Sequence, residues 1–326
     1  MSRDGKQGRK VETARRGRPL PSIVWASAVL AVAASIGVPG FASRANVTDI
    51  GLQIAMLVMI AMPMTLVILS EGLDLSVGAL LSLCGVVFAM TLGAGFGVAA
   101  ALLIAAAVGI AIGLLNGTLI ARLGLPPFVV TLGTLGISQG IALALTDGNA
   151  VVVGTPAVAQ LYAWSALGVP FPVLCALAAY AATHLLLYHT KFGAYVFAIG
   201  GNREALVLAG VKARAFHVAI YALSGLFAGL AALLLVGRMN AAEPTSAIGM
   251  EFDAIAAVVL GGTSFERGEG GLFGTLMGVV TIGVLRNALN LLGVESSLQV
   301  VSVGMLVLLV VVVDSVRKSR VIGAQA

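Results

Sequence analysis

Residues 74–122, DLSVGALLSLCGVVFAMTLGAGFGVAAALLIAAAVGIAIGLLNGTLIAR, carry a charge only at their two ends, Asp74 and Arg122. The 47 residues between these charges leave room for two helices of about 20 residues, the length that crosses the hydrocarbon core of a bilayer. We therefore expect membrane-spanning helices near 75–92 and 96–121.

Similar apolar runs make up most of the chain. Charge-free intervals also separate Asp49 from Glu71, Arg122 from Asp147, Asp147 from Lys191, and Arg214 from Arg238. Hydrophobic residues form 59% of the 326 residues and charged residues 10%, and the mean hydropathy is +1.06. A soluble protein of this length needs more charge to hydrate its surface. The composition predicts an all-α, polytopic membrane helical bundle.

The net charge of +5 lies entirely in residues 1–18, which hold seven basic and two acidic residues. A basic segment before an apolar run favours retention of the N-terminus in the cytoplasm over nucleic-acid binding. We therefore expect a cytoplasmic tail over 1–19. The alternative is a cleaved signal peptide over 1–45, but its apolar run is long for one and only Ala42-Ser43-Arg44 resembles a cleavage site.

A charged, glycine-punctuated segment, KFGAYVFAIGGNREALVLAGVKAR (191–214), separates two long apolar runs. Asn202 is a helix N-cap residue and Gly210 is a helix stop, so a short helix is expected over 202–209. A capped helix on the basic face of a membrane protein is suited to contact with a soluble partner. The alternative is an ordinary connecting loop with one helical turn.

The charge pattern predicts ten transmembrane helices. The expected spans are 20–40, 48–70, 75–92, 96–121, 127–146, 168–189, 214–237, 251–263, 270–292 and 296–315. Ten crossings place 16 of the 19 basic residues on the cytoplasmic side, in agreement with the positive-inside rule. Span 251–263 is short and begins with Glu251 and Asp253, but its omission would export the basic C-terminus. We expect a permease domain over 20–315 and a cytoplasmic tail over 316–326.

Glycines four residues apart occur in three predicted spans. They are Gly109, Gly113 and Gly117, then Gly225 and Gly229, and then Gly270, Gly274 and Gly278. Small residues at this spacing let helix backbones approach closely in lipid. The chain has no GxxxxGK[ST] phosphate loop. Cys84 and Cys175 fall in predicted spans and form no metal-binding pattern, so we expect no cofactor or metal.

Polar groups at membrane depth are candidates for a translocation path. These are Asp74, Asn116, Gln139, Asn287 and Asn290. Glu71 and Asp74 should lie at a water-facing boundary, line a cavity or cap a helix, and Asp74 can cap a helix that begins at Leu75. The alternative is that each amide side chain bonds a neighbouring helix.

Four separated motifs resemble the permease subunit of ribose/xylose-type bacterial ABC importers. They are GLDLSVGALLSL, LNGTLIARLGLPPFVVTLGTLGISQGIAL, KFGAYVFAIGGNREALVLAGV, and the stretch from LSGLFAGLAALLL through AIAAVVLGGTSF to NALNLLGV. They are collinear from about residue 50 to 315. The resemblance implies a permease dimer in the bacterial inner membrane, cytoplasmic ATPase subunits and an extracytoplasmic sugar-binding protein. It also implies a monosaccharide or polyol as substrate.

The resemblance and the capped helix together predict a segment that couples the permease to its ATPase. Its residues are Gly200, Gly201, Asn202, Arg203, Glu204 and Gly210. Two positions depart from the family pattern: Glu71 stands where glycine is usual, and ERGEGG follows GGTSF. These departures bear on the choice of sugar rather than on the transporter class.

Two other classes of function remain open. An ion-coupled secondary transporter of a small neutral solute needs a series of ionisable groups within the membrane. Glu71, Asp74 and Arg286 are too few to form such a series. An intramembrane enzyme needs a catalytic constellation. His184, His189 and His217 gather toward the basic face without a nucleophile or metal-ligand spacing.

Overall fold

A computed structural model describes residues 22–265 and 268–323 of the chain. The described residues form twelve helices: α1 (Ser22–Gly37), α2 (Arg44–Leu69), α3 (Val77–Gly93), α4 (Val98–Leu123), α5 (Pro127–Thr146), α6 (Pro156–Ala163), α7 (Phe171–His189), α8 (Lys191–Leu208), α9 (Ala213–Met239), α10 (Met250–Leu260), α11 (Leu272–Leu291) and α12 (Ser296–Gly323). Two short antiparallel ribbons pair β1 (Val151–Val152) with β4 (Ala241–Ala242) and β2 (Ser165–Ala166) with β3 (Val169–Pro170).

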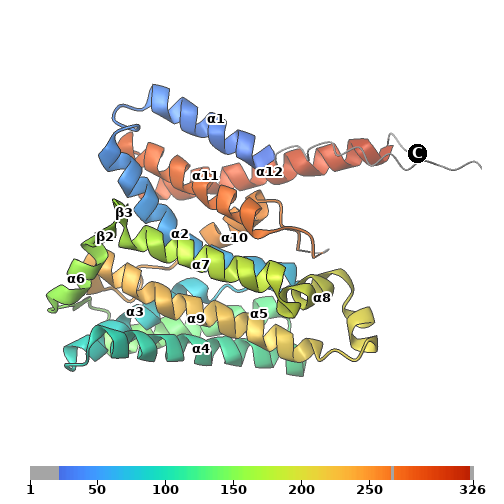
Figure 1. Cartoon of the computed structure of the whole chain (residues 1–326), viewed down its shortest axis with the longest axis horizontal. Helices are drawn as coiled ribbons and strands as arrows, with labels where there is room; N and C mark the ends of the chain where they lie inside the picture. Colours follow the sequence, from blue (N-terminus) through green and yellow to red (C-terminus); the bar gives the residue numbers. More distant parts are fainter. Residues whose placement is uncertain (1–21, 266–267, 324–326) are drawn as a thin grey trace, which may run out of the picture.

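The long helices lie roughly along one common direction, which gives the bundle two ends (Figure 1). One end carries α8 and the C-terminal end of α12, and we call it the α8 end. The other carries α6, β2 and β3, and we call it the α6 end. Each predicted span overlaps an observed helix, so the all-α prediction is confirmed. The predicted tail 1–19 lies outside the described residues, and α12 continues as helix through 316–323.

Six helices in the described part of the chain are long and apolar enough to cross a membrane. They are α2, α4, α5, α7, α9 and α11. In α2, every residue from Ala55 to Leu69 is buried, and α3 is buried over most of its length. Both therefore lie inside the bundle. By contrast, less than a third of the apolar window of each of α4, α5 and α7 is buried, and the large exposed side chains on these three helices are mostly apolar. This arrangement is typical of a bundle whose outer helices face lipid.

Glycines hold α4 against α9, as the sequence predicts. A Cβ added at Gly109 would meet the carbonyl of Gly225, and one at Gly113 would meet the carbonyl of Tyr221. On α11, Gly278 likewise faces the α10 backbone at Ala257, and Gly274 faces Gly261, the residue that follows α10. The prediction fails at Gly270, which precedes α11 and has φ +141°. Its backbone conformation, rather than helix packing, explains that glycine.

Helix α10 begins inside the bundle. Its 11 residues span about 16 Å, roughly half of the ~30 Å hydrocarbon core. The irregular segment 243–249 precedes α10 and contacts α3, because the Ala247 amide donates to Ser82 Oγ at 3.0 Å. Arg286 of α11 pairs with Asp253 near the start of α10 at 2.7 Å. Segment 243–249 and α10 together thus follow the bundle over a greater length than the helix alone.

Candidate functional site

Residues 70–76, SEGLDLS, form an irregular connection between α2 and α3 that is buried except at Glu71 and partly at Leu73. Irregular backbone within a membrane bundle is tolerated where protein covers it and satisfies its polar groups. Tyr221 of α9 does this for Leu73: its hydroxyl accepts from the Leu73 amide at 3.2 Å and donates to the Leu73 carbonyl at 3.2 Å. The connection is thereby tied to α9.

Asp74 is held by hydroxyl groups and backbone. Its Oδ1 accepts from the amide and hydroxyl of Ser76 at 3.0 and 2.6 Å, and its Oδ2 accepts from Ser224 Oγ at 2.8 Å. Among the described residues the ion pair is Arg286 with Asp253, so hydrogen bonds rather than a counter-ion stabilise Asp74. The prediction that Asp74 caps a helix at Leu75 is wrong. Helix α3 begins at Val77, and the carboxylate bonds the residue before it.

Asn116 of α4 joins the same network. Its Nδ2 donates to Ser76 Oγ at 3.0 Å, while its buried Oδ1 has no hydrogen-bond partner among the described residues. On α9, His217, Tyr221 and Ser224 follow one another at helical spacing on the side that meets this network. We call these three side chains, with Asp74, Ser76 and Asn116, the polar seam.

Among the described residues, no hydrogen bond links the other three path candidates to the polar seam. Gln139 lies half-buried on α5, and its Oε1 has no partner among the described residues. Asn287 of α11 exchanges hydrogen bonds of 2.8 and 2.9 Å with Asn46 of α2. This is the bond to a neighbouring helix that the sequence analysis gave as the alternative to a role in the path. Asn290 is exposed. Of the five candidates, only Asp74 and Asn116 come together.

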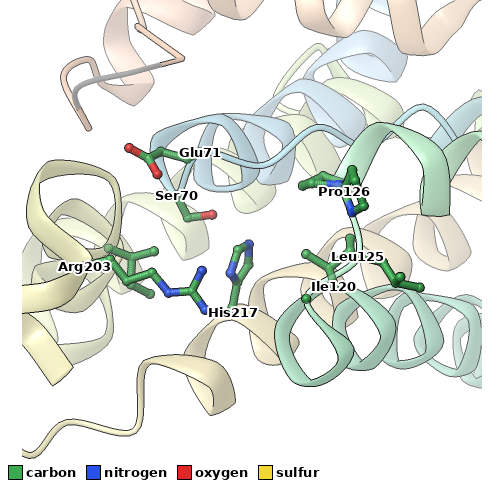
Figure 2. Close-up of a pocket in the computed structure, with 10 residues that line it drawn as sticks. Ser70, Glu71, Ile120, Leu125, Pro126, Arg203 and His217 are labelled. Carbon is green, nitrogen blue, oxygen red and sulfur yellow. The ribbon is translucent and has the colours of Figure 1, made fainter.

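A cavity of about 220 Å³ opens beside the polar seam. Its lining includes Ser70, Glu71, Ile120, Arg203 and His217. Figure 2 shows the guanidinium of Arg203 close to the His217 ring, and the carboxylate of Glu71 turned away from that ring at the rim. The side chain of His217 is only 5% exposed, yet neither ring nitrogen has a hydrogen-bond partner among the described residues.

The predicted coupling segment is helical and capped at Asn202. Within α8, Asn202 has non-helical angles (φ −160°, ψ 85°), and its Oδ1 accepts from the Ala205 amide at 2.9 Å. Gly210 follows the helix with φ +79°, the conformation of a helix stop. The predicted cap and stop are confirmed. The first half of α8 was expected as loop, but Thr190 caps it by accepting from the Phe192 amide at 3.2 Å.

Gly200 attaches α8 to the end of α2. A Cβ at Gly200 would meet the carbonyl of Leu69 and the Cα of Gly268, so only glycine permits this approach. Gly201, Arg203 and Glu204 are exposed beside it.

The outer end of α8 is apolar and surrounded by basic residues. Leu208 is 88% exposed and Val207 is 56% exposed. A groove of about 610 Å³ next to them is lined by Arg122, Arg203, Lys212 and Arg214, among others. An exposed leucine within a basic rim is typical of a surface that binds a partner.

Sequence reasoning missed Ser76, Ser224 and Tyr221. Their roles depend on contacts between segments that are 40 to 150 residues apart. The available signal was the spacing of His217, Tyr221 and Ser224 on a single face of an otherwise apolar helix.

Comparison with known proteins places this arrangement among transport permeases. Residues 46–312 match the family described as "Branched-chain amino acid transport system / permease component". The ribose import permease protein of Escherichia coli is 38% identical over 298 residues, which cover 90% of this chain and 92% of the relative. The ribose import permease protein of Bacillus subtilis is 40% identical over 288 residues, covering 88% and 89%. The D-allose transport system permease protein of Escherichia coli is 36% identical over 287 residues, covering 88% of each chain. No solved structure matches the chain.

Proposed function

Because this chain belongs to the permease-component family of branched-chain amino acid transport systems, we propose that it is the permease of an ATP-driven ABC importer and carries a monosaccharide or related polyol across the bacterial cytoplasmic membrane. The observation that carries the proposal is the similarity to sugar permeases over 88–90% of the chain. Relatives of this length and identity are named for ribose and allose, which favours a sugar over an amino acid.

The chain is a transport subunit and not an enzyme in this proposal. It has no GxxxxGK[ST] loop, so ATP is hydrolysed by separate cytoplasmic ATPase subunits. An extracytoplasmic sugar-binding protein delivers the substrate, and two copies of the permease form a homodimer in the lipid. The ion-coupled alternative is less well supported, because the buried carboxylate Asp74 is held by Ser76 and Ser224 rather than by a series of ionisable groups.

We propose ten crossings, with the α8 end in the cytoplasm. The basic residues that line the groove at this end support the assignment under the positive-inside rule. The eighth crossing consists of segment 243–249 together with α10. It starts after β4, which follows the end of α9. It ends at Gly261, which follows α10 and meets Gly274 at the start of α11. In this arrangement both termini are cytoplasmic.

The outer half of α8 is proposed as the coupling helix that docks into a cleft on the ATPase. Asn202 separates it from the inner half, and Gly200 keeps that inner half against Leu69 at the end of α2. A displacement of Arg203–Leu208 by the ATPase would therefore be transmitted through Gly200 to Leu69, the residue that precedes the irregular connection 70–76.

Co-purification tests the ABC assignment. Tagged permease co-expressed with its ATPase should retain that subunit through detergent extraction and size-exclusion chromatography. Replacement of the exposed Leu208 by Glu should reduce retention. Leu167→Glu, at a fully exposed leucine between β2 and β3, should leave it unchanged. Loss of the ATPase from the wild-type permease under every gentle extraction condition would contradict the proposal.

A further inference from the structure

We propose that the exposed side of residues 245–252 is one wall of the translocation path, and that Ile248 and Phe252 form an apolar constriction in it. This inference rests on the proposed function, which requires a sugar to cross the bundle, and on the proposed eighth crossing. It assigns the path to a surface that a solute can reach, whereas Asp74 and Asn116 are buried in the polar seam.

The segment that precedes α10 lies at membrane depth. Helix α11 is long enough to cross a membrane, and its Gly278 and Gly274 meet Ala257 and Gly261 in turn. The two helices are therefore antiparallel, and Met250 lies about 10 Å beyond the level of Gly278 toward the α6 end. About 10 Å of α11 remains beyond Met250. Segment 243–249 passes through this depth on its way from β4, which pairs with β1 just before α6.

One side of this segment packs on α3. The Ala247 amide donates to Ser82 Oγ at 3.0 Å, and a Cβ added at Gly78 would meet the carboxylate of Glu251. That carboxylate is buried and accepts from the Gly249 amide at 3.0 and 3.1 Å. These contacts fix which side of residues 245–252 turns away from α3.

The opposite side is open. Thr245 is exposed, Ile248 is 45% exposed, and Phe252, in the first turn of α10, is 61% exposed. Lipid does not meet such a surface, because irregular backbone within the hydrocarbon region occurs only where protein buries it or where it lines a water-filled cavity. The open side of residues 245–252 therefore faces either water or the second copy of the permease.

Unpaired carbonyls favour water over a dry contact with the second copy. The amides of Ile248, Met250 and Phe252 donate to carbonyls three residues back. By contrast, no hydrogen bond among the described residues ends on the carbonyls of Ser246 and Ile248. A second copy related by a twofold axis would present the same surface, which lacks donors in the same way. Water supplies these donors, so a water-filled gap separates the two copies here.

The order of side chains along the open side suits a sugar. The Thr245 hydroxyl lies toward the α6 end and can bond the hydroxyls of an entering sugar. Ile248 and Phe252 lie deeper and present apolar surface to the C–H groups of the sugar ring. Hydrophobic constrictions of this kind gate membrane pores, and a permeating solute must be bound weakly enough to leave.

A cation is the main competing solute, because two carboxylates lie close to Phe252. Asp253 is paired with Arg286 at 2.7 Å, and Glu251 is buried against α3 and bonds the Gly249 amide. Neither carboxylate is a free charge on the open side. The wall is therefore suited to a neutral solute.

Cysteine labelling of the reconstituted permease–ATPase complex tests the wall. Thr245→Cys, Ile248→Cys and Phe252→Cys are each made in the Cys175→Ser background. The variants are treated with a small charged thiol reagent, first without nucleotide and then during ATP hydrolysis with the sugar-binding protein. All three positions should react in at least one of these states, because each side chain meets water.

Two controls define the alternatives. Leu103→Cys on α4 is a lipid-facing position, since Leu103 is 71% exposed, and the native Cys84 is a buried one. A thiol reacts as its thiolate, which is costly to form away from water, so both controls should react at least about tenfold more slowly.

Phe252→Trp tests the constriction by enlarging its side chain. ATP-driven sugar uptake should slow severalfold, while the melting temperature and the retention of the ATPase stay at wild-type values. Leu103→Trp enlarges an exposed side chain on α4 and should leave uptake unchanged. Wild-type uptake in Phe252→Trp would overturn the constriction.

The labelling rates also decide against the wall if it is wrong. Reaction of all three cysteines only as slowly as Leu103→Cys would place residues 245–252 against lipid. Reaction only as slowly as Cys84 would place them in a dry contact between copies, and either result overturns the inference. A complex that imports sugar with ATP but gives one of these results keeps the proposed function and loses only the wall. Rapid labelling in a complex that imports no sugar with ATP contradicts the proposed function and leaves the water-filled wall in place.

Discussion

Gly113 lies where α4 crosses α9, against the main-chain carbonyl of Tyr221. Tyr221 also holds Leu73 of the irregular connection, so one close backbone contact positions both a helix crossing and the polar seam. Gly133 on α5 is a contrasting residue, because a Cβ added there meets nothing within 4 Å. The two positions separate the effect of packing from that of helix propensity.

Gly113→Ala should destabilise the permease, whereas Gly133→Ala should be neutral or stabilising. Both changes raise helix propensity by about 0.5–1 kcal/mol, but only the first forces a methyl group into backbone, which typically costs about 1–3 kcal/mol. Thermal unfolding in one detergent compares the two variants. Equal melting temperatures would show that α4 and α9 do not cross as closely as described.

At the scale of elements, α8 is divided by Asn202 into an inner half attached to α2 and an outer half that carries Leu208. The Asn202 side chain caps the outer half through Ala205, and an N-cap of this kind contributes about 0.5–2 kcal/mol. Loss of the cap should loosen the outer half without disturbing the buried helices around it.

Asn202→Ala combined with Glu204→Ala should uncouple ATP hydrolysis from uptake and leave membrane insertion normal. The matched control is Asn149→Ala with Glu243→Ala, an exposed Asn and Glu outside α8. Transport and ATPase activity are measured on the same reconstituted preparation. Unchanged uptake and unchanged ATPase stimulation in the Asn202 and Glu204 variant would contradict the coupling role.

At the scale of the whole molecule, the path of the chain depends on how α10 and segment 243–249 traverse the bundle. Cysteines at Ala209 and at Ser319, after Arg317, should react with a membrane-impermeant reagent only from the cytoplasm, and one at Ala150 only from outside. Cys175→Ser provides the background, since Cys84 is buried. Labelling of positions 209 and 319 from opposite sides would show that 243–260 does not cross.

Sequence alone predicted those features that depend on local composition. Charge-free intervals located the helices because each must present apolar surface over its whole length. The cap at Asn202 and the stop at Gly210 followed from rules that involve only a few neighbouring residues. The inner half of α8 was missed because its mixed composition resembles a loop.

The polar seam could not be predicted in the same way. Asp74, Asn116 and Ser224 meet only after three segments pack together, and nothing local distinguishes Asn116 from Asn287, which bonds Asn46 instead. The depth within the bundle at which α10 begins could not be predicted from the sequence for a related reason. It depends on the contact of Ala247 with Ser82 rather than on composition.

ATP-driven sugar uptake tests the central claim most directly. Proteoliposomes that contain permease, ATPase and sugar-binding protein should accumulate a monosaccharide when ATP is present on the ATPase side. Ionophores that collapse proton and sodium gradients should not stop this uptake, since ATP hydrolysis drives it. Uptake by the permease alone, abolished by a protonophore and indifferent to ATP, would contradict the account and favour an ion-coupled transporter.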